Sequence, residues 1–237
     1  MRAAWVSSDL SSLHAFLSAL QLADASFPTG LYTQSHGLES FVQRGVVTDR
    51  AALAALLETY LVHQIGPADG VALSCAHAAA GDLRSVARID QRLSATKLIR
   101  ESREASRKTG QRVLALAADI FGSSRLVAYR DIATADPGLG NYAVVLGLVT
   151  GAVGVERQEA MAIELYSFAT GFLGAGMRLS VVNHEEVQAV LHAIKPLIAR
   201  VVEENWEKGY QEISTSLPEA DIMGMIHERA VVRLFVS

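Results

Sequence analysis

Apolar residues recur every three or four positions along most of this chain, and that spacing marks one face of an α-helix. The strongest stripe lies in a helix expected to begin near residue 48, and it consists of Leu53, Leu56, Leu57, Tyr60 and Leu61. A second stripe near the N-terminus consists of Leu13, Phe16, Leu17 and Leu20. No segment shows the strict alternation of a β-strand. The pattern therefore predicts a succession of amphipathic helices.

Turn and cap residues divide this pattern into separate helices. Gly66-Pro67 is expected to end one helix and start another, because proline lacks the N–H that a helix interior needs. Asp82 is expected to cap the following helix. Asn183 is expected to cap a later one, in a capping box with Glu186.

These elements predict an all-α fold, a single-domain bundle of roughly ten helices with a C-terminal tail. Residues 1–210 are assigned to the helical domain and residues 211–237 to a partner-binding tail, because Leu217-Pro218 interrupts the periodicity. The uncharged segment Tyr142–Val155 is expected to be a buried helix, since a membrane span needs about 20 residues. Apolar residues at the very end of the chain have to be buried against something.

The segment from Ala25 to Phe41 concentrates polar groups between two apolar helical patterns. Pro28 is expected to stop the preceding helix. Thr33 or Ser35 is expected to cap a short helix over residues 35–44. Such loops often present groups to a ligand or partner, but the same residues also suit an ordinary corner between two helices. The residues alone leave both interpretations open.

Composition excludes several classes of protein. The net charge of −4 argues against a dedicated nucleic-acid binder, and one cysteine, Cys75, excludes an intramolecular disulfide framework. A single cysteine and the lack of a signal-peptide pattern predict a cytoplasmic protein. The mean hydropathy of +0.24 predicts that a second subunit covers apolar surface, as in a homodimer.

No catalytic residue, cofactor site or metal site is predicted. The chain lacks the GxxxxGK[ST] phosphate loop and the HExxH metal motif. Cys75 and His77 are two positions apart, so they point in different directions on a helix. His184 and His227, each followed by a glutamate, are expected to be solvated groups near helix ends.

Basic residues cluster in the middle of the chain. Arg100, Arg103 and Arg107 follow the i, i+3, i+7 spacing of one helix face. Two interpretations stay open, a solvated face and a site for an acidic partner, since guanidinium groups bind carboxylates in bidentate fashion.

Three segments, taken together, resemble one known family. Residues 22–39 read LADASFPTGLYTQSHGLE, residues 100–103 read RESR ahead of Thr109-Gly110, and the chain ends in His227-Glu228 and then RLFVS over residues 233–237. In order and in length, these segments resemble the urease accessory proteins of type F. The likeness covers almost the whole chain.

This resemblance implies a dimeric, all-helical, non-enzymatic chaperone component without a cofactor of its own. It implies that accessory protein H (also called D) binds partly through the C-terminal tail. It also implies that the complex recruits accessory protein G, a nickel-binding GTPase, for GTP-dependent nickel insertion into apo-urease. The candidate interface residues are Gly30, Tyr32, Ser35, His36, Glu39, Arg100, Arg103, Arg107, His227, Glu228, Arg233, Leu234, Phe235 and Ser237.

Two alternatives accompany this hypothesis. In the first, the chain directly regulates the GTPase activity of accessory protein G, with Glu39 or an arginine of the basic face acting at the partner's nucleotide site. In the second, the helices form an enzyme whose catalytic groups meet only in space.

Overall fold

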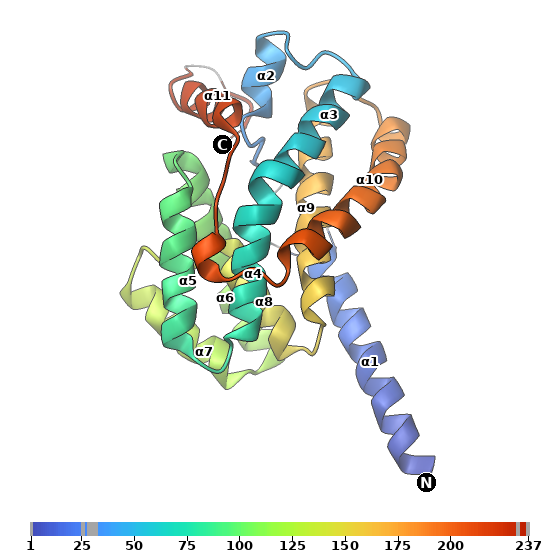
Figure 1. Cartoon of the computed structure of the whole chain (residues 1–237), viewed down its shortest axis with the longest axis vertical. Coiled ribbons are helices and arrows are strands. Elements are labelled where there is room, and N and C mark those ends of the chain that lie inside the picture. The colour runs from blue at the N-terminus through green and yellow to red at the C-terminus, as the bar shows by residue number, and fades with distance from the viewer. Residues whose placement is uncertain (1, 25–26, 28–32, 231–232, 236–237) are drawn as a thin grey trace.

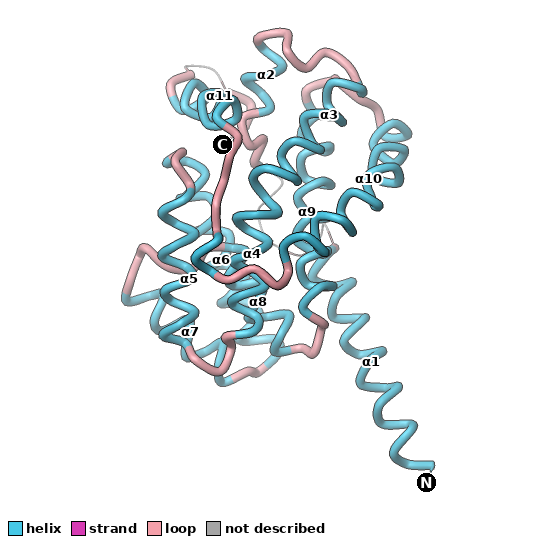
Figure 2. The backbone as a smooth tube through the Cα atoms, viewed as in Figure 1, coloured by secondary structure: helices cyan, strands magenta, loops and turns pink. Residues whose placement is uncertain are grey.

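The computed structural model is a bundle of helices, and no strand occurs among the residues it describes (Figures 1 and 2). These are residues 2–24, 27, 33–230 and 233–235, with side chains from residue 10 onward. The helices are α1 (Arg2–Ala23), α2 (Leu38–Gln43), α3 (Arg50–Tyr60), the π-helix η2 (Leu61–Gly70), α4 (Val71–Ala78), α5 (Leu83–Thr96), α6 (Arg100–Phe121), α7 (Ser124–Ala135), α8 (Tyr142–Ala152), α9 (Arg157–Arg178), α10 (His184–Asn205), the 3-10 turn η3 (Tyr210–Glu212) and α11 (Pro218–Glu228). The predicted all-α, single-domain fold is confirmed.

Helix α8 lies at the centre of the core. Every side chain from Tyr142 to Thr150 is buried, and the helix packs against α4 and α6. Gly147 permits this approach, because a Cβ there would lie 2.4 Å from the carbonyl oxygen of Leu73 on α4. The predicted buried helix is confirmed. In the described ranges, no helix combines the length and the apolar character needed to cross a membrane.

The helix predicted to end at Gly66-Pro67 continues through both residues. Helices α3, η2 and α4 follow one another without a break from Arg50 to Ala78. Pro67 cannot donate to the carbonyl of His63, four residues earlier. That carbonyl instead accepts a hydrogen bond of 2.9 Å from the Ser216 amide. The prediction was wrong because a distant segment supplies the donor that proline lacks.

The capping predictions were right at two sites and wrong at a third. Asp82 accepts hydrogen bonds from the first turn of α5, and Asn183 forms the expected capping box at α10. Helix α2, however, begins at Leu38 and has no side-chain cap. The chain enters it through two left-handed residues, His36 (φ 52°) and Gly37 (φ 81°). A tight backbone turn thus replaces the cap expected from residue 33 or 35.

Helix α1 extends away from the body of the bundle, with the N-terminus at its far end (Figure 1). Its last part contacts α9. An amphipathic helix ordinarily turns its apolar stripe to the core, but Leu13, Phe16, Leu17 and Leu20 are each more than half exposed. The predicted helix therefore exists, and its apolar face has no cover within the described chain.

The predicted tail is partly helical. Helix α11 starts with Pro218 in its first turn, a position where the missing N–H costs nothing. It lies beside α2, far from it in sequence (Figure 1). A Cβ on Gly37 would lie 3.3 Å from the amide nitrogen of Gly224, so the lack of a side chain at Gly37 lets the turn before α2 approach α11 closely.

Candidate functional site

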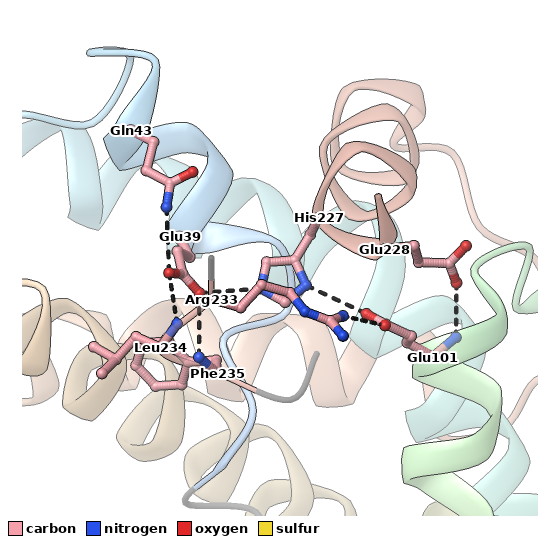
Figure 3. Close-up of polar contacts among 8 residues, drawn as sticks. All are labelled: Glu39, Gln43, Glu101, His227, Glu228, Arg233, Leu234 and Phe235. Atoms are coloured by element: carbon pink, nitrogen blue, oxygen red, sulfur yellow. Dashed lines mark hydrogen bonds and ion pairs between the residues drawn. The ribbon is translucent and has the colours of Figure 1, made fainter. Parts of the chain in front are cut away.

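Glu39 on α2 is the centre of a polar cluster that binds residues 233–235 near the C-terminus (Figure 3). Its carboxylate is 4% exposed. Oε1 accepts a hydrogen bond of 2.8 Å from the backbone N–H of Leu234, and Oε2 accepts one of 3.2 Å from that of Phe235. Gln43, one turn later on α2, donates its side-chain amide to Oε1 at 3.2 Å. One side chain thus binds two consecutive amides of the C-terminal segment.

His227 on α11 joins this carboxylate to a second one. Its Nε2 lies 3.0 Å from Oε2 of Glu39, and its Nδ1 lies 3.3 Å from Oε2 of Glu101 on α6. The ring is 2% exposed. A protonated imidazole is the form that can donate to both oxygens at once. The histidine therefore links α2, α6 and α11 at a single point.

Glu101 and Glu228 complete the cluster from α6 and α11. The guanidinium of Arg233 forms an ion pair with Oε1 of Glu101. The backbone N–H of Glu101 donates in turn to Oε1 of Glu228 at 2.8 Å, which satisfies an N–H group in the first turn of α6. We call the group of Glu39, Glu101, His227, Glu228 and Arg233 the C-terminal clamp.

Phe235 anchors the segment that the clamp holds. Its ring is 4% exposed, and the guanidinium carbon of Arg178 on α9 lies 4.4 Å from the ring centroid. Leu234, the preceding residue, is 64% exposed. The segment therefore buries one apolar side chain in its own bundle and presents the next one to solvent.

The charge state of Glu39 follows from these contacts. Burial raises the pKa of its carboxyl group, but hydrogen bonds from the Leu234 amide, the His227 ring and the Phe235 amide outweigh that effect. The net pKa lies below its usual value of 4.5. Glu39 is therefore ionised at neutral pH, the form that accepts all of these hydrogen bonds.

The structure brings together six of the predicted interface residues: Glu39, His227, Glu228, Arg233, Leu234 and Phe235. The prediction that His227 is a solvated helix-end group was wrong. Although it lies in the last turn of α11, packing of α11 on α2 and α6 encloses the ring between two carboxylates.

The other predicted residues are distributed differently. Gly30, Tyr32 and Ser237 lie outside the described residues. Ser35 is fully buried. His36 is partly buried, its ring centroid lies 4.8 Å from that of Phe168, and its carbonyl accepts a hydrogen bond from Tyr60. These two residues stabilise the turn, which corresponds to the corner interpretation of this segment.

Arg100, Arg103 and Arg107, the predicted basic face of α6, differ in exposure and in contacts. Arg100 is exposed and Arg107 is half-buried. Arg103 instead donates from Nη1 to the backbone carbonyl of Leu98 at 2.8 Å, and also to that of Lys97, just before α6. The three residues therefore do not form one free guanidinium surface.

Sequence reasoning missed Glu101, Gln43 and Arg178. Glu101 lies among arginines in the sequence. Its contacts are 126 positions or more away in the chain, so no local pattern indicates them. Gln43 follows Glu39 by four positions on one helix, and that i, i+4 spacing was the one available signal.

The groups of the C-terminal clamp are suited to holding protein segments together. Its carboxylates and cations bind each other and the backbone. No group of three or more histidine, cysteine or carboxylate residues suited to a metal ion occurs among the residues that the structure describes. Cys75 donates to the carbonyl of Lys208, and His77 lies 2.9 Å from the carbonyl oxygen of Val155. The cluster holds residues 233–235.

Apolar side chains lie exposed near the C-terminal clamp. Ile222 and Met225, one turn apart on α11, are 56% and 41% exposed, and Leu234 precedes the buried phenylalanine. Isolated exposed apolar residues are ordinary, but several on one element are typical of a binding surface. The clamp thus fixes the positions of groups that another protein can contact.

Comparison with known proteins identifies the family. The UreF family model matches residues 47–195, more than half of the chain. The chain belongs to the UreF family. It is 30% identical over 221 residues to urease accessory protein UreF of Paenarthrobacter aurescens (strain TC1), covering 93% of this chain and 97% of that protein. It is also 30% identical to urease accessory protein UreF of Trichodesmium erythraeum (strain IMS101), over 98% of this chain and 100% of the relative.

A third UreF relative, urease accessory protein UreF 2 of Brucella abortus (strain 2308), is 30% identical over 233 residues, covering 98% of this chain and 96% of that protein. The predicted resemblance is therefore confirmed. The matched length of these relatives extends well beyond the residues of the family model, into the region that carries α11 in this UreF chain.

Proposed function

We propose that this chain is an accessory protein of urease maturation and acts as a non-enzymatic scaffold. In this role it assembles with accessory proteins H (D) and G and takes part in GTP-dependent nickel insertion into apo-urease. Family membership supports the accessory role, since the relatives are named urease accessory proteins. The observation that carries the scaffold role is the C-terminal clamp, which binds backbone amides rather than a small molecule.

In this proposal, the region from residue 211 onward is the surface for accessory protein H. The clamp presents Leu234 beside α11, whose Ile222 and Met225 are also exposed. A preordered segment binds with a smaller loss of conformational entropy than a disordered one. Holding the tail in place therefore favours association with the partner.

Urease activation in cells that lack this chain tests the accessory role. Restoring the full chain is expected to restore urease activity, while urease subunits accumulate to the same level with or without it. Full urease activity in its absence would contradict the role.

A chain that lacks residues 233–237 is expected to remain helical and to retain little accessory protein H in a pull-down. Undiminished capture would contradict the assignment of the tail.

Regulation of accessory protein G is a second candidate function, supported by one observation. Arg100 is exposed at the start of α6, one residue before Glu101 of the clamp. An arginine supplied to a partner's nucleotide site accelerates phosphoryl transfer by about 10³–10⁵. GTP turnover by accessory protein G, measured with the wild-type complex and with Arg100→Ala, tests this candidate. Equal rates would rule it out.

A homodimer in the cytoplasm completes the proposal. The apolar face of α1 supports self-association, because four large apolar side chains on one helix are more than half exposed. A second copy that covers this face would remove the apolar surface from water.

A further inference from the structure

An open pocket of about 340 Å³ lies where η3 packs against α4 and α5, and it shares no residue with the C-terminal clamp. This volume falls within the range of about 300–1,000 Å³ that is typical of ligand pockets. Arg88, Gly209 and Tyr210 line the pocket and are exposed, so the pocket is accessible from solvent. It is therefore a candidate binding site that the clamp does not explain.

Two arginines line this pocket, and no carboxylate does. Arg88 on α5 is exposed, while Arg157, the first residue of α9, is half-buried. Neither guanidinium forms an ion pair with an acid in the part of the chain that the structure describes. Guanidinium groups form strong, bidentate hydrogen bonds with carboxylates. An anion in the pocket would therefore supply the partner that both arginines lack.

Trp206 orients the guanidinium of Arg157, whose central carbon lies 4.5 Å from the centroid of the indole ring. Stacking uses the flat face of the guanidinium and leaves the N–H groups along its edge free to bind a carboxylate. Arg157 also lies in the first turn of α9, where the helix dipole disfavours a positive charge. An anion explains this position better than the stability of the helix does.

Two acids flank the pocket, and both are bound elsewhere. Asp82 accepts hydrogen bonds from the first turn of α5, and Glu212 accepts one of 2.8 Å from the Gly209 amide. Burial raises the pKa of the Cys75 thiol on the pocket wall, and Arg157 lowers it more strongly than Glu212 raises it. The electrostatic potential at this wall is therefore positive.

We propose that this pocket binds an acidic side chain presented by another protein. Arginine and tyrosine are enriched in the energetically important part of protein interfaces, and Arg88, Arg157 and Tyr210 supply them here. A small-molecule site buries most of its ligand, which an open pocket does not do. A protein segment brings its own surface to exclude water around the carboxylate. Ala78 and Ala79 offer apolar contacts to the residues beside that acid.

Peptide binding to the purified full chain tests the pocket. Acetyl-Leu-Glu-Leu-amide and acetyl-Leu-Gln-Leu-amide are titrated at low ionic strength, where screening is weak, and the Nε–H signal of Arg157 is followed by NMR. The acidic peptide is expected to shift this signal saturably and to bind at least about tenfold more tightly than the glutamine peptide. Equal affinities of the two peptides would overturn the proposal.

Sodium acetate and sodium phosphate distinguish a protein segment from a free anion. Both supply a negative charge without the flanking apolar residues, so each is expected to bind at least about tenfold more weakly than the acidic peptide. If either anion binds as tightly as that peptide, the pocket is a site for small anions and the proposal is overturned. No accessory protein enters these titrations, so their failure would leave the proposed function unaffected.

Three variants locate the binding, which is followed at the Tyr210 amide. Arg88→Gln and Arg157→Gln each remove one guanidinium and are expected to weaken binding of the acidic peptide at least about tenfold. Arg84→Gln is the matched control, because it removes the same charge one turn earlier on α5, at an exposed position outside the pocket. Its affinity is expected to stay within about twofold of wild type.

The exposed position of Arg88 keeps the test valid if Arg157→Gln, which loses its stacking on Trp206, does not fold. Full binding of the acidic peptide by Arg88→Gln would overturn the proposal. An equal loss of binding in Arg84→Gln and Arg88→Gln would mean diffuse attraction to a basic surface, and would overturn it as well.

Discussion

The Nε2 atom of His227 lies 3.0 Å from Oε2 of Glu39, although 188 positions separate the two residues in the chain. This contact joins the short helix α2 to α11 in a site where both side chains are buried. The same carboxylate also binds the amides of Leu234 and Phe235. The order of the C-terminal segment is therefore coupled to the position of a helix near the start of the bundle.

Glu39→Gln is expected to loosen the C-terminal segment. The amide nitrogen of glutamine cannot accept a hydrogen bond, so at least one of the donors that face Glu39 loses its partner. Loss of a buried partner costs about 1–3 kcal/mol. The measurements are the free energy of unfolding and hydrogen exchange at the amides of Leu234 and Phe235, which are expected to exchange faster.

Glu58→Gln is the matched control, because Glu58 is exposed on α3. It is expected to change the free energy of unfolding by less than about 0.5 kcal/mol. Unaltered exchange at residues 234 and 235 in Glu39→Gln would show that the clamp does not hold the segment.

Two adjacent substitutions separate anchoring from partner binding. Phe235→Ala removes a buried ring and is expected to lower the free energy of unfolding by about 3–5 kcal/mol. Leu234→Asp changes an exposed side chain, so it is expected to leave stability within about 0.5 kcal/mol while it weakens capture of accessory protein H. Thermal unfolding and pull-down on the same samples check both effects. Equal capture by Leu234→Asp and wild type would exclude this surface from the interface.

The succession of helices was predictable because apolar spacing and caps are local signals. The stripe from Leu53 to Leu61 and the capping box of Asn183 and Glu186 were correctly interpreted for that reason. The failure at Pro67 is long-range. Pro67 remains within a helical segment because Ser216 bonds the carbonyl that proline leaves free, a partner some 150 positions later that no local rule supplies.

Four of the five clamp residues were among the predicted interface residues, but their contacts could not be predicted. A resemblance across the whole chain identified Glu39, His227 and Arg233, but their partner Glu101 looked like one acid among several arginines. Its role follows from the packing of α6 beside α11, which brings its carboxylate to the imidazole. Buried polar contacts of this kind depend on tertiary structure, so their partners cannot be derived from spacing.

The apolar face of α1 is expected to mediate self-association. Phe16→Glu or Leu17→Glu places a charge on this face and is expected to shift the chain to monomer, because a carboxylate buried in an apolar contact lacks a partner. Stability of the monomer is expected to change little, since both side chains are exposed. Ser11→Glu adds the same charge at another exposed position of α1 and is the control. Sedimentation of all variants at equal concentration checks this. Unchanged association of Phe16→Glu would exclude α1 from the interface.

The stability of the protein is expected to decrease as the pH rises toward 8, and Glu164 is the reason. Its pKa is raised from 4.5 to about 8, first by burial and then by Asp69, against the opposing effect of Lys97. The folded state therefore holds this proton more tightly than the unfolded state. The stability it contributes is fully present below pH 4.5 and is lost as the pH rises through about 8.

His36 changes the stability of the folded state in the opposite direction over part of this pH range. The pKa of His36 is lowered from 6.5 to about 4, so its contribution to stability increases with pH up to 6.5. From pH 6.5 to 8, the contribution of His36 therefore no longer opposes that of Glu164. Unfolding free energies of wild type and Glu164→Gln, measured there in tetramethylammonium chloride, are expected to show a decline only in wild type. Parallel profiles would mean that Glu164 has the same pKa in the folded and unfolded states, and therefore that burial does not raise this pKa.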